Sequence, residues 1–205
     1  MRKGAKNLEK ELNAQLLKER EVIKEFNNTA IRIFEREKKM MLSAFDNHPI
    51  TREIRGGANG SNLSGTMQGG NLFGFIGFPA GSDPISPLRE VLEKTNIRPK
   101  MDRQRTAEKI YEVELPEENV LRAATPMPWA SGRSWLLGIE NGMSGLGRYL
   151  DTESPYSRSG GGIQSKHIVK GGSFTGVTYL TNGGILSDFK KRIIELSAGR
   201  NISIK

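Results

Sequence analysis

Residues 7–49 read NLEKELNAQLLKEREVIKEFNNTAIRIFEREKKMMLSAFDNHP, the longest patterned stretch of the chain. No Pro or Gly interrupts it between Ala5 and Asn47. Apolar residues recur at spacings of three, four and seven, which places them on one helical face: Leu8, Leu12, Leu16, Ile23, Phe26, Ala30, Ile33, Phe34, Met41 and Phe45. The pattern predicts one helix over residues 7–45. Pro49 disfavours helix at the residue before it, and we expect His48 to cap the C-terminal end.

Such a helix would be roughly 55–60 Å long at 1.5 Å per residue, which exceeds the width of a small domain. Its apolar face either packs on the helix's own domain or reaches a neighbouring subunit. The spacing of the residues is compatible with both arrangements.

The remaining residues predict shorter elements. Residues 56–70 are rich in glycine and predict a long exposed loop, and residues 71–78 predict a strand. We further expect a helix over 88–95 with Ser86 as its N-cap, a strand over 109–115 and a helix over 116–124. Two more strand regions are predicted over 134–139 and 168–180. A last amphipathic helix carries Leu186, Phe189, Ile193 and Leu196 and ends at Gly199.

The order of these elements predicts an α+β fold. Strands do not alternate regularly with helices of crossover length, so we expect a mainly antiparallel sheet with short helices. The predicted organisation is a long N-terminal helix over 1–47, followed by an α+β domain over 48–205 that closes with the C-terminal helix.

Composition excludes several kinds of chemistry. The 205 residues contain no Cys, which rules out a disulfide scaffold, a thiolate zinc site and a cysteine nucleophile. There are 31 Lys and Arg against 23 Asp and Glu, a formal net charge of +8 that suits an anionic partner. No stretch resembles a signal peptide or a membrane span, so we expect synthesis in the cytoplasm and no membrane partner.

Catalytic motifs fail at the residues that would carry the chemistry. Gly60 and Gly65 have phosphate-loop spacing, but Thr66 and Met67 follow where Lys and Ser or Thr are needed. Ser144 has Leu146 where a nucleophile elbow has its last glycine. The sequence therefore predicts no catalytic residue, no cofactor and no metal site, and we expect a protein that is not an enzyme.

Four segments carry a resemblance to a known group of proteins. They are PWASGRSWLLGIENGMSGLGRYL (128–150), SRSGGGIQ (157–164), NHPITREI (47–54) and NLFGFIGF (71–78). Together they resemble the neck, head–tail connector and tail-completion proteins of tailed bacteriophages, especially contractile-tailed ones. The resemblance implies a structural virion protein, assembled in the host cytoplasm, that forms a homo-oligomeric ring. It further implies contacts with other neck, portal or tail proteins and nonspecific contact with packaged double-stranded DNA.

Aromatic and arginine residues in the resembling segments are candidates for the subunit interface, because Trp, Tyr and Arg are enriched among interface hot spots. The candidates are Arg133, Trp135, Arg148, Tyr149 and Arg158. Both tryptophans could instead belong to the core. Two other functions stay open: a basic nucleic-acid-binding module, and a small enzyme with an unrecognised site.

Overall fold

The computed structural model describes residues 8, 11, 12, 15, 19–66, 70–103, 108–142, 150–151, 163–164, 176–196 and 202–204. The fold is α+β, as predicted. The chain forms two compact units. Unit 1 comprises Met1–Met40, Thr95–Leu115 and Phe189–Lys205, and unit 2 comprises Met41–Lys94 and Pro116–Asp188. This division differs from the predicted boundary at residue 47, because unit 1 joins most of the long helix to two distant segments.

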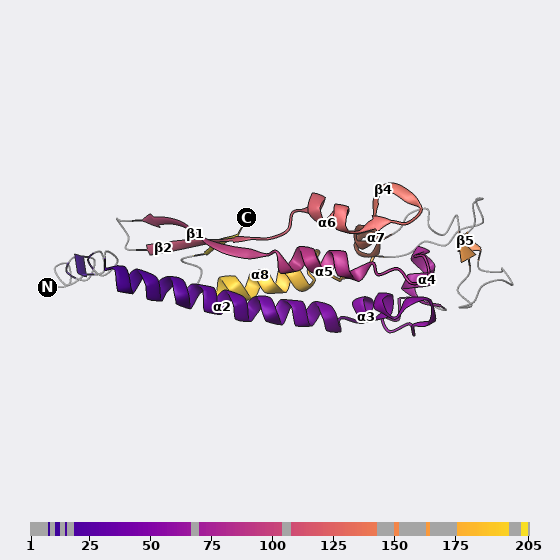
Figure 1. Cartoon of the computed structure of the whole chain (residues 1–205), viewed down its shortest axis with the longest axis horizontal. Helices are drawn as coiled ribbons and strands as arrows, with labels where there is room; N and C mark the ends of the chain where they lie inside the picture. Colours follow the sequence, from indigo (N-terminus) through magenta and orange to yellow (C-terminus); the bar gives the residue numbers. More distant parts are fainter. Residues whose placement is uncertain are drawn as a thin grey trace. The chain divides into compact units, whose positions relative to one another are not determined.

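Unit 1 combines the long helix with a three-stranded sheet. Helix α2 (Arg20–Asn47) contributes its residues up to Met40, and residues 8, 11, 12 and 15 are also helical. The sheet has the order β1-β2-β7 and consists of β1 (Asn96–Arg103), β2 (Glu108–Glu114) and β7 (Ile202–Ile204). Strands β1 and β2 form the antiparallel pair seen in Figure 1, whereas β7 joins β2 in parallel. The strand over 109–115 and the end of the long helix are thus confirmed, but the start predicted at residue 7 is wrong for this helix, because Glu19 is not helical and α2 begins at Arg20.

Polar and aromatic contacts hold α2 to the rest of unit 1. The Asn27 side-chain oxygen accepts hydrogen bonds from Lys109 Nζ at 3.0 Å and from the Tyr111 hydroxyl at 2.9 Å. Phe34 meets Phe189 edge to face, with 6.1 Å between the ring centres. Phe189 lies on α8 (Ile185–Leu196), the predicted C-terminal helix. One face of α2 is therefore occupied by β2 and α8.

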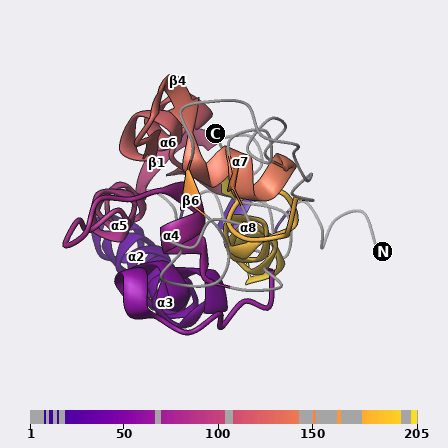
Figure 2. The same ribbon diagram turned by 90° about the vertical axis from the view of Figure 1, so that its right-hand side faces the viewer.

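Unit 2 is built mostly of short helices. They are α3 (Pro49–Arg55), the 3₁₀ turn η1 (Gly57–Asn59), α4 (Leu72–Ile76), α5 (Ile85–Glu93), α6 (Glu118–Ala124) and α7 (Trp135–Asn141). Antiparallel pairs join β3 (Pro126–Met127) to β4 (Ala130–Ser134) and β5 (Leu150–Asp151) to β6 (Ile163–Gln164). Figures 1 and 2 both place α4 between α3 and α7. The helix predicted over 116–124 is confirmed as α6.

The strand predicted over 71–78 is wrong, because these residues form helix α4. The Asn71 side chain accepts a hydrogen bond from the Gly74 amide, which caps the helix start. Gly77 ends the helix in the left-handed region at φ 80°, a conformation that glycine adopts without strain. Leu72, Phe73, Phe75 and Ile76 are all buried, so a short apolar run here signals a buried helix.

The strand predicted over 134–139 is wrong for the same reason. The Ser134 hydroxyl accepts a hydrogen bond from the Leu137 amide and starts α7, and only Ser134 belongs to a strand. Of the predicted strand region 168–180, residues 168–175 lie outside the described residues. Residues 176–180 are described and are not strand.

Two cap assignments also change. Helix α5 begins at Ile85, three residues earlier than predicted, and the Asp83 carboxylate accepts from the amides of Ile85 and Ser86. His48 is the N-cap of α3 rather than a C-terminal cap of α2, because its Nδ1 accepts from the Ile50 amide at 3.3 Å.

The described part of the glycine-rich loop is tied to two polar side chains of unit 2. Buried Glu53 accepts from the amides of Ser64 at 2.8 Å and Leu72 at 2.7 Å. The Asn71 amide group donates to the carbonyl oxygens of Gly57, Ala58 and Gly60. The described residues 57–66 and 70–72 are thus held by hydrogen bonds within unit 2, although many of the side chains over 57–66 are partly or fully exposed.

Candidate subunit interface

Helix α2 presents a row of apolar side chains that the packing of unit 1 leaves open. Phe26, Ile33 and Met40 recur every seven residues and hence share one side of the helix. Phe26 is 51% exposed and Met40 is 46% exposed, and Ile33 is half-buried. Unit 1 instead covers the adjoining side, where Phe34 is buried. We call Phe26, Ile33 and Met40 the apolar stripe.

A row of basic residues runs beside the apolar stripe. Arg32, Arg36 and Lys39 are exposed and follow one another at i, i+4 and i+7, so they share a second line on α2. Arg36 is bonded to the buried carboxylate of Glu37 at 2.9 Å, whereas Arg32 donates a 3.3 Å hydrogen bond to the neutral Thr29 hydroxyl. We call these three residues the basic row.

The charge of the chain is divided unequally between the units. Unit 1 contains 21 Lys and Arg against 12 Asp and Glu, which gives +9. Unit 2 contains 10 Lys and Arg against 11 Asp and Glu, which gives −1. The whole positive surplus therefore belongs to unit 1, where it favours an anionic partner surface.

Unit 2 exposes a tryptophan on the β3–β4 hairpin. Trp129 is 38% exposed, and its indole N–H donates to the Ile76 carbonyl at 2.8 Å. This bond fixes the ring to the end of α4, so the exposed face of the ring needs little further ordering on binding. Arg133 on β4 is also exposed, as the prediction of an interface residue requires.

The other predicted interface residues divide into two groups. Trp135 is only 1% exposed and meets Phe78 edge to face at 5.9 Å, so it is a core residue of unit 2. Of the two interpretations that the sequence left open for Trp135, the structure supports the core. Arg148, Tyr149 and Arg158 lie outside the described residues.

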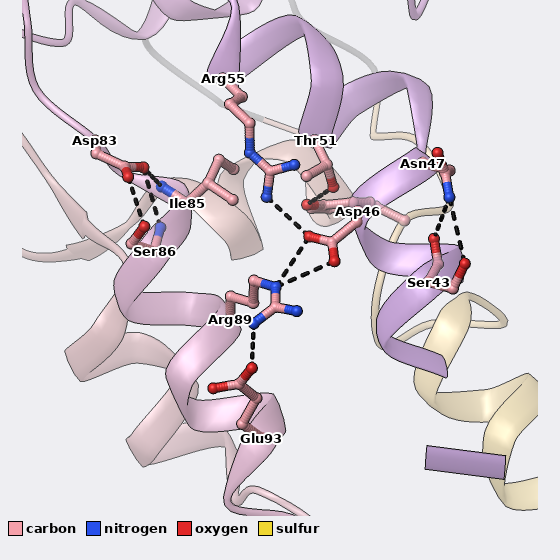
Figure 3. Close-up of polar contacts among 11 residues, drawn as sticks. Ser43, Asp46, Asn47, Thr51, Arg55, Asp83, Ile85, Ser86, Arg89 and Glu93 are labelled. Carbon is pink, nitrogen blue, oxygen red and sulfur yellow. Dashed lines mark hydrogen bonds and ion pairs between the residues drawn. The ribbon is translucent and has the colours of Figure 1, made fainter. Parts of the chain in front are cut away.

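Asp46 joins three helices of unit 2, as Figure 3 shows. It accepts from Arg55 of α3 at 2.8 Å and from Arg89 of α5 at 3.1 Å on each carboxylate oxygen, and Arg89 also pairs with Glu93. Partial burial alone would raise the pKa of Asp46, but the two arginines outweigh it and hold that pKa below its ordinary value. This cluster fixes the end of α2 against α3 and α5.

Other buried polar groups of unit 2 are also occupied by partners within the unit. Glu140 accepts from the amides of Leu180 at 2.6 Å and Thr181 at 2.5 Å. The buried Tyr179 hydroxyl lies 2.7 Å from the Thr51 hydroxyl, and burial raises the pKa of Tyr179. The His48 ring lies 4.8 Å from the Tyr179 ring, and burial lowers the pKa of His48. A neutral His48 matches its task, since only a deprotonated Nδ1 can accept the capping bond.

Within the described part of the chain, no three His, Asp or Glu side chains are grouped so that they could hold a metal ion. None of the helices described is both long and apolar enough to cross a bilayer. Comparison with known proteins returned no matching family model, no matching curated protein and no matching solved structure. Any function must therefore be inferred from the surfaces of the two units.

The sequence analysis missed part of this candidate interface. The apolar spacing in α2 was assigned to one packing face, yet α2 has more apolar residues than one such face accommodates. Met40, seven residues after Ile33 and beside buried Met41, was the available signal that a second apolar line exists. The helical spacing of Arg32, Arg36 and Lys39 could have revealed the basic row in the same way.

Proposed function

We propose that the chain is a non-enzymatic structural subunit of a bacteriophage virion, a ring-forming neck or tail-completion protein that joins head and tail. The observation that supports it is the open apolar stripe on α2. Phe26 and Met40 are about half exposed, so their apolar surface stays in contact with water in the isolated chain. Burying this surface against another protein would lower the free energy. A ring supplies such a contact to every subunit.

The proposal extends to the partners that the phage resemblance implies. The subunit lies in the virion between other neck, portal or tail proteins, after assembly in the host cytoplasm. The surplus of +9 on unit 1 suits nonspecific contact with the phosphates of packaged DNA. Binding of this kind weakens steeply as salt rises.

The experiment is size measurement of the purified full chain by light scattering, together with electron microscopy of the protein and of phage particles. We expect a closed ring. The double variant Phe26→Ser/Met40→Ser should shift the protein towards monomers. Ile31→Ser is the matched control, since Ile31 is an exposed apolar residue on another side of the same helix. Monomers alone at every concentration, with none of the protein in assembled particles, would contradict the proposal.

A nucleic-acid-binding module is the second candidate function. The concentration of positive charge in unit 1 favours it, and a titration with double-stranded DNA at two salt concentrations tests it. Tight, sequence-selective binding at physiological salt supports this candidate. Weak binding that disappears with salt fits the ring protein.

A further inference from the structure

We propose that two copies of the chain pair through their α2 helices, which run antiparallel and cover each other's apolar stripe. Within one chain, Phe26 and Met40 of this stripe are left about half exposed. A contact about a two-fold axis joins two copies and does not require the proposed ring. A ring built from such pairs would need a further contact on another face, and it would hold an even number of copies.

The apolar stripe belongs to a longer row of positions that is suited to pairing with another helix. Val22, Thr29 and Arg36 lie between its members, and the row steps alternately by four and three residues through positions 22, 26, 29, 33, 36 and 40. Such steps place side chains on the seam of a two-helix coiled coil. None of these six residues is buried within the chain, and four of them are apolar. A second helix is therefore the kind of partner that this face can receive.

Charge changes sign along α2 beside this row. Exposed Glu21 and Glu25 lie on the same helical line as the basic row, which follows them towards the C-terminal end of the helix. Glu25 accepts a 3.4 Å hydrogen bond from the Thr29 hydroxyl, and neither Glu25 nor Lys39 forms an ion pair with another described residue of its own chain. The line is thus acidic at its start and basic at its end.

This change of sign favours a second copy as the partner and sets its direction. In a parallel pair in register, Arg36 would lie against Arg36 and Glu25 beside Glu25. An antiparallel pair instead brings the acidic start of each line to the basic end of the other, which lowers the energy of the pair. Phosphates of DNA would be repelled by Glu21 and Glu25 and would leave the apolar side chains in water.

The register follows from centring the pair midway between residues 22 and 40, so that the whole row is covered. Met40 then lies level with Val22 of the second copy, and Ile33 lies level with Thr29 of the second copy. Each exposed apolar side chain of the stripe is thereby placed against the seam of the other helix.

The same register brings unlike charges together at both ends of the pair. Glu25 lies one residue, about 1.5 Å along the axis, from the level of Arg36 of the second copy. It lies two residues, about 3 Å, from the level of Lys39 of that copy. Arg32 lies equally near the level of Arg32 of the second copy, so one like-charge approach opposes the attraction. The unlike contacts occur twice in the pair and the like contact once, so attraction prevails.

Disulfide cross-linking in the full chain tests direction and register, because the chain contains no Cys. Val22→Cys and Met40→Cys are made as two separate variants. Mixed and mildly oxidised, they should form a disulfide between copies. Neither alone should do so, because like positions lie 18 residues, about 27 Å, apart along the pair. Lys24→Cys mixed with Met40→Cys is the matched control for random collision, since Lys24 lies on the opposite side of α2 and should not cross-link.

Charge variants test the same contact by analytical ultracentrifugation. Glu25→Lys and Lys39→Glu should each weaken self-association by about tenfold, and the two changes together should associate more tightly than either alone. Arg32→Gln should strengthen association by about threefold, because it removes the like charges near the centre of the pair. Lys24→Glu changes an exposed cation away from the seam and should leave association unchanged. Circular dichroism checks that each variant is folded.

The outcomes separate this contact from the proposed function. Cross-linking of each single variant with itself would show a parallel pair and overturn the inference, as would association that no charge variant alters. Rings in which the mixed cysteines do not cross-link would overturn the contact and leave the proposed function standing. Cross-linked dimers with no ring, in solution or in particles, support the contact and contradict the proposed function. A chain that is monomeric at every concentration and absent from particles contradicts both.

Discussion

Unit 1 and unit 2 differ in where they place charge. In unit 2 the carboxylates of Glu53 and Glu140 are turned inward and accept backbone hydrogen bonds. In unit 1 the ion pair between Arg98 and Glu112 joins an exposed side chain of β1 to a buried side chain of β2, and the basic row faces solvent. The difference indicates that buried carboxylates fix the path of the backbone in unit 2, whereas the polar groups of unit 1 bond mainly to other side chains, as Asn27 does to Lys109 and Tyr111.

The largest expected effect comes from removing a buried carboxylate of unit 2. Glu53→Ala should reduce the free energy of unfolding by about 3 kcal/mol, because the amides of Ser64 and Leu72 lose a charged acceptor inside the protein. Urea unfolding followed by tryptophan fluorescence measures it, since both tryptophans belong to unit 2. Glu53→Gln keeps one acceptor oxygen and should lose less. Equal stability of Glu53→Ala and the unaltered chain would contradict the conclusion that buried carboxylates stabilise the backbone of unit 2.

A smaller loss is expected from the cluster in Figure 3. Asp46→Ala should cost about 1–2 kcal/mol, because the carboxylate is partly exposed and its bonds to Arg55 and Arg89 are partly screened by water. The pKa of Asp46 is lowered from 3.8, so its contribution is complete above that pH and disappears as the pH falls further. Acid unfolding should therefore be less steep in Asp46→Ala, and an identical acid profile would argue against the cluster.

His48 gives a further, pH-dependent test within unit 2. Burial lowers its pKa from 6.5, so the folded protein prefers the neutral ring. The stability that the neutral ring provides is complete well above pH 6.5 and declines as the pH falls below that value. His48→Asn retains a capping acceptor without titrating, and its unfolding free energy should change less between pH 7.5 and pH 5.5 (roughly one unit either side of the ordinary histidine pKa). The same pH dependence in both proteins would exclude His48 as its source.

The smallest effect is expected in unit 1. Arg98→Ala removes the ion pairs of β1 with Glu112 and Glu114 and should lower the unfolding free energy less than the other variants, because the Arg98 side chain is half exposed and water screens its charge, while Glu112 keeps its ion pair with Lys100. Far-ultraviolet circular dichroism during urea unfolding provides the measurement, because unit 1 has no tryptophan. A loss as large as that of Glu53→Ala would show that unit 1 also depends on its charged groups.

Regular apolar spacing was enough to predict most of α2, α8 and β2, since each buries one face, and α6 was predicted from Pro116 and the two glutamates that follow it. It failed where a single polar side chain controls the backbone. Asn71 and Ser134 turn apolar runs into α4 and α7 by capping them, and spacing alone cannot distinguish such a run from a strand. Strand β1 was missed because Arg98, Pro99 and Lys100 do not alternate, and its place comes from pairing with β2.

The candidate interface was predictable only in part. Arg133 is exposed as the resemblance to phage proteins requires, but exposure of Trp135 depends on the fold around Phe78, which no local pattern reveals. The apolar stripe can be found in the sequence by placing the apolar residues of α2 on two neighbouring lines of the helix, one with Phe26, Ile33 and Met40 and the other with Phe34 and Met41. Which of them is covered depends on contacts with Tyr111 and Phe189, far away along the chain.

The parallel pairing of β7 with β2 has a consequence for how the protein is made. Every residue of unit 2 precedes Phe189, so a ribosome finishes unit 2 before it supplies the segment that completes unit 1. Until residues 202–204 emerge, one edge of β2 has no neighbour and α2 lacks Phe189 against Phe34. During translation the nascent chain would thus expose an unpaired strand edge and the apolar face of a helix, both of which favour aggregation. A polysome would hold many such chains close together.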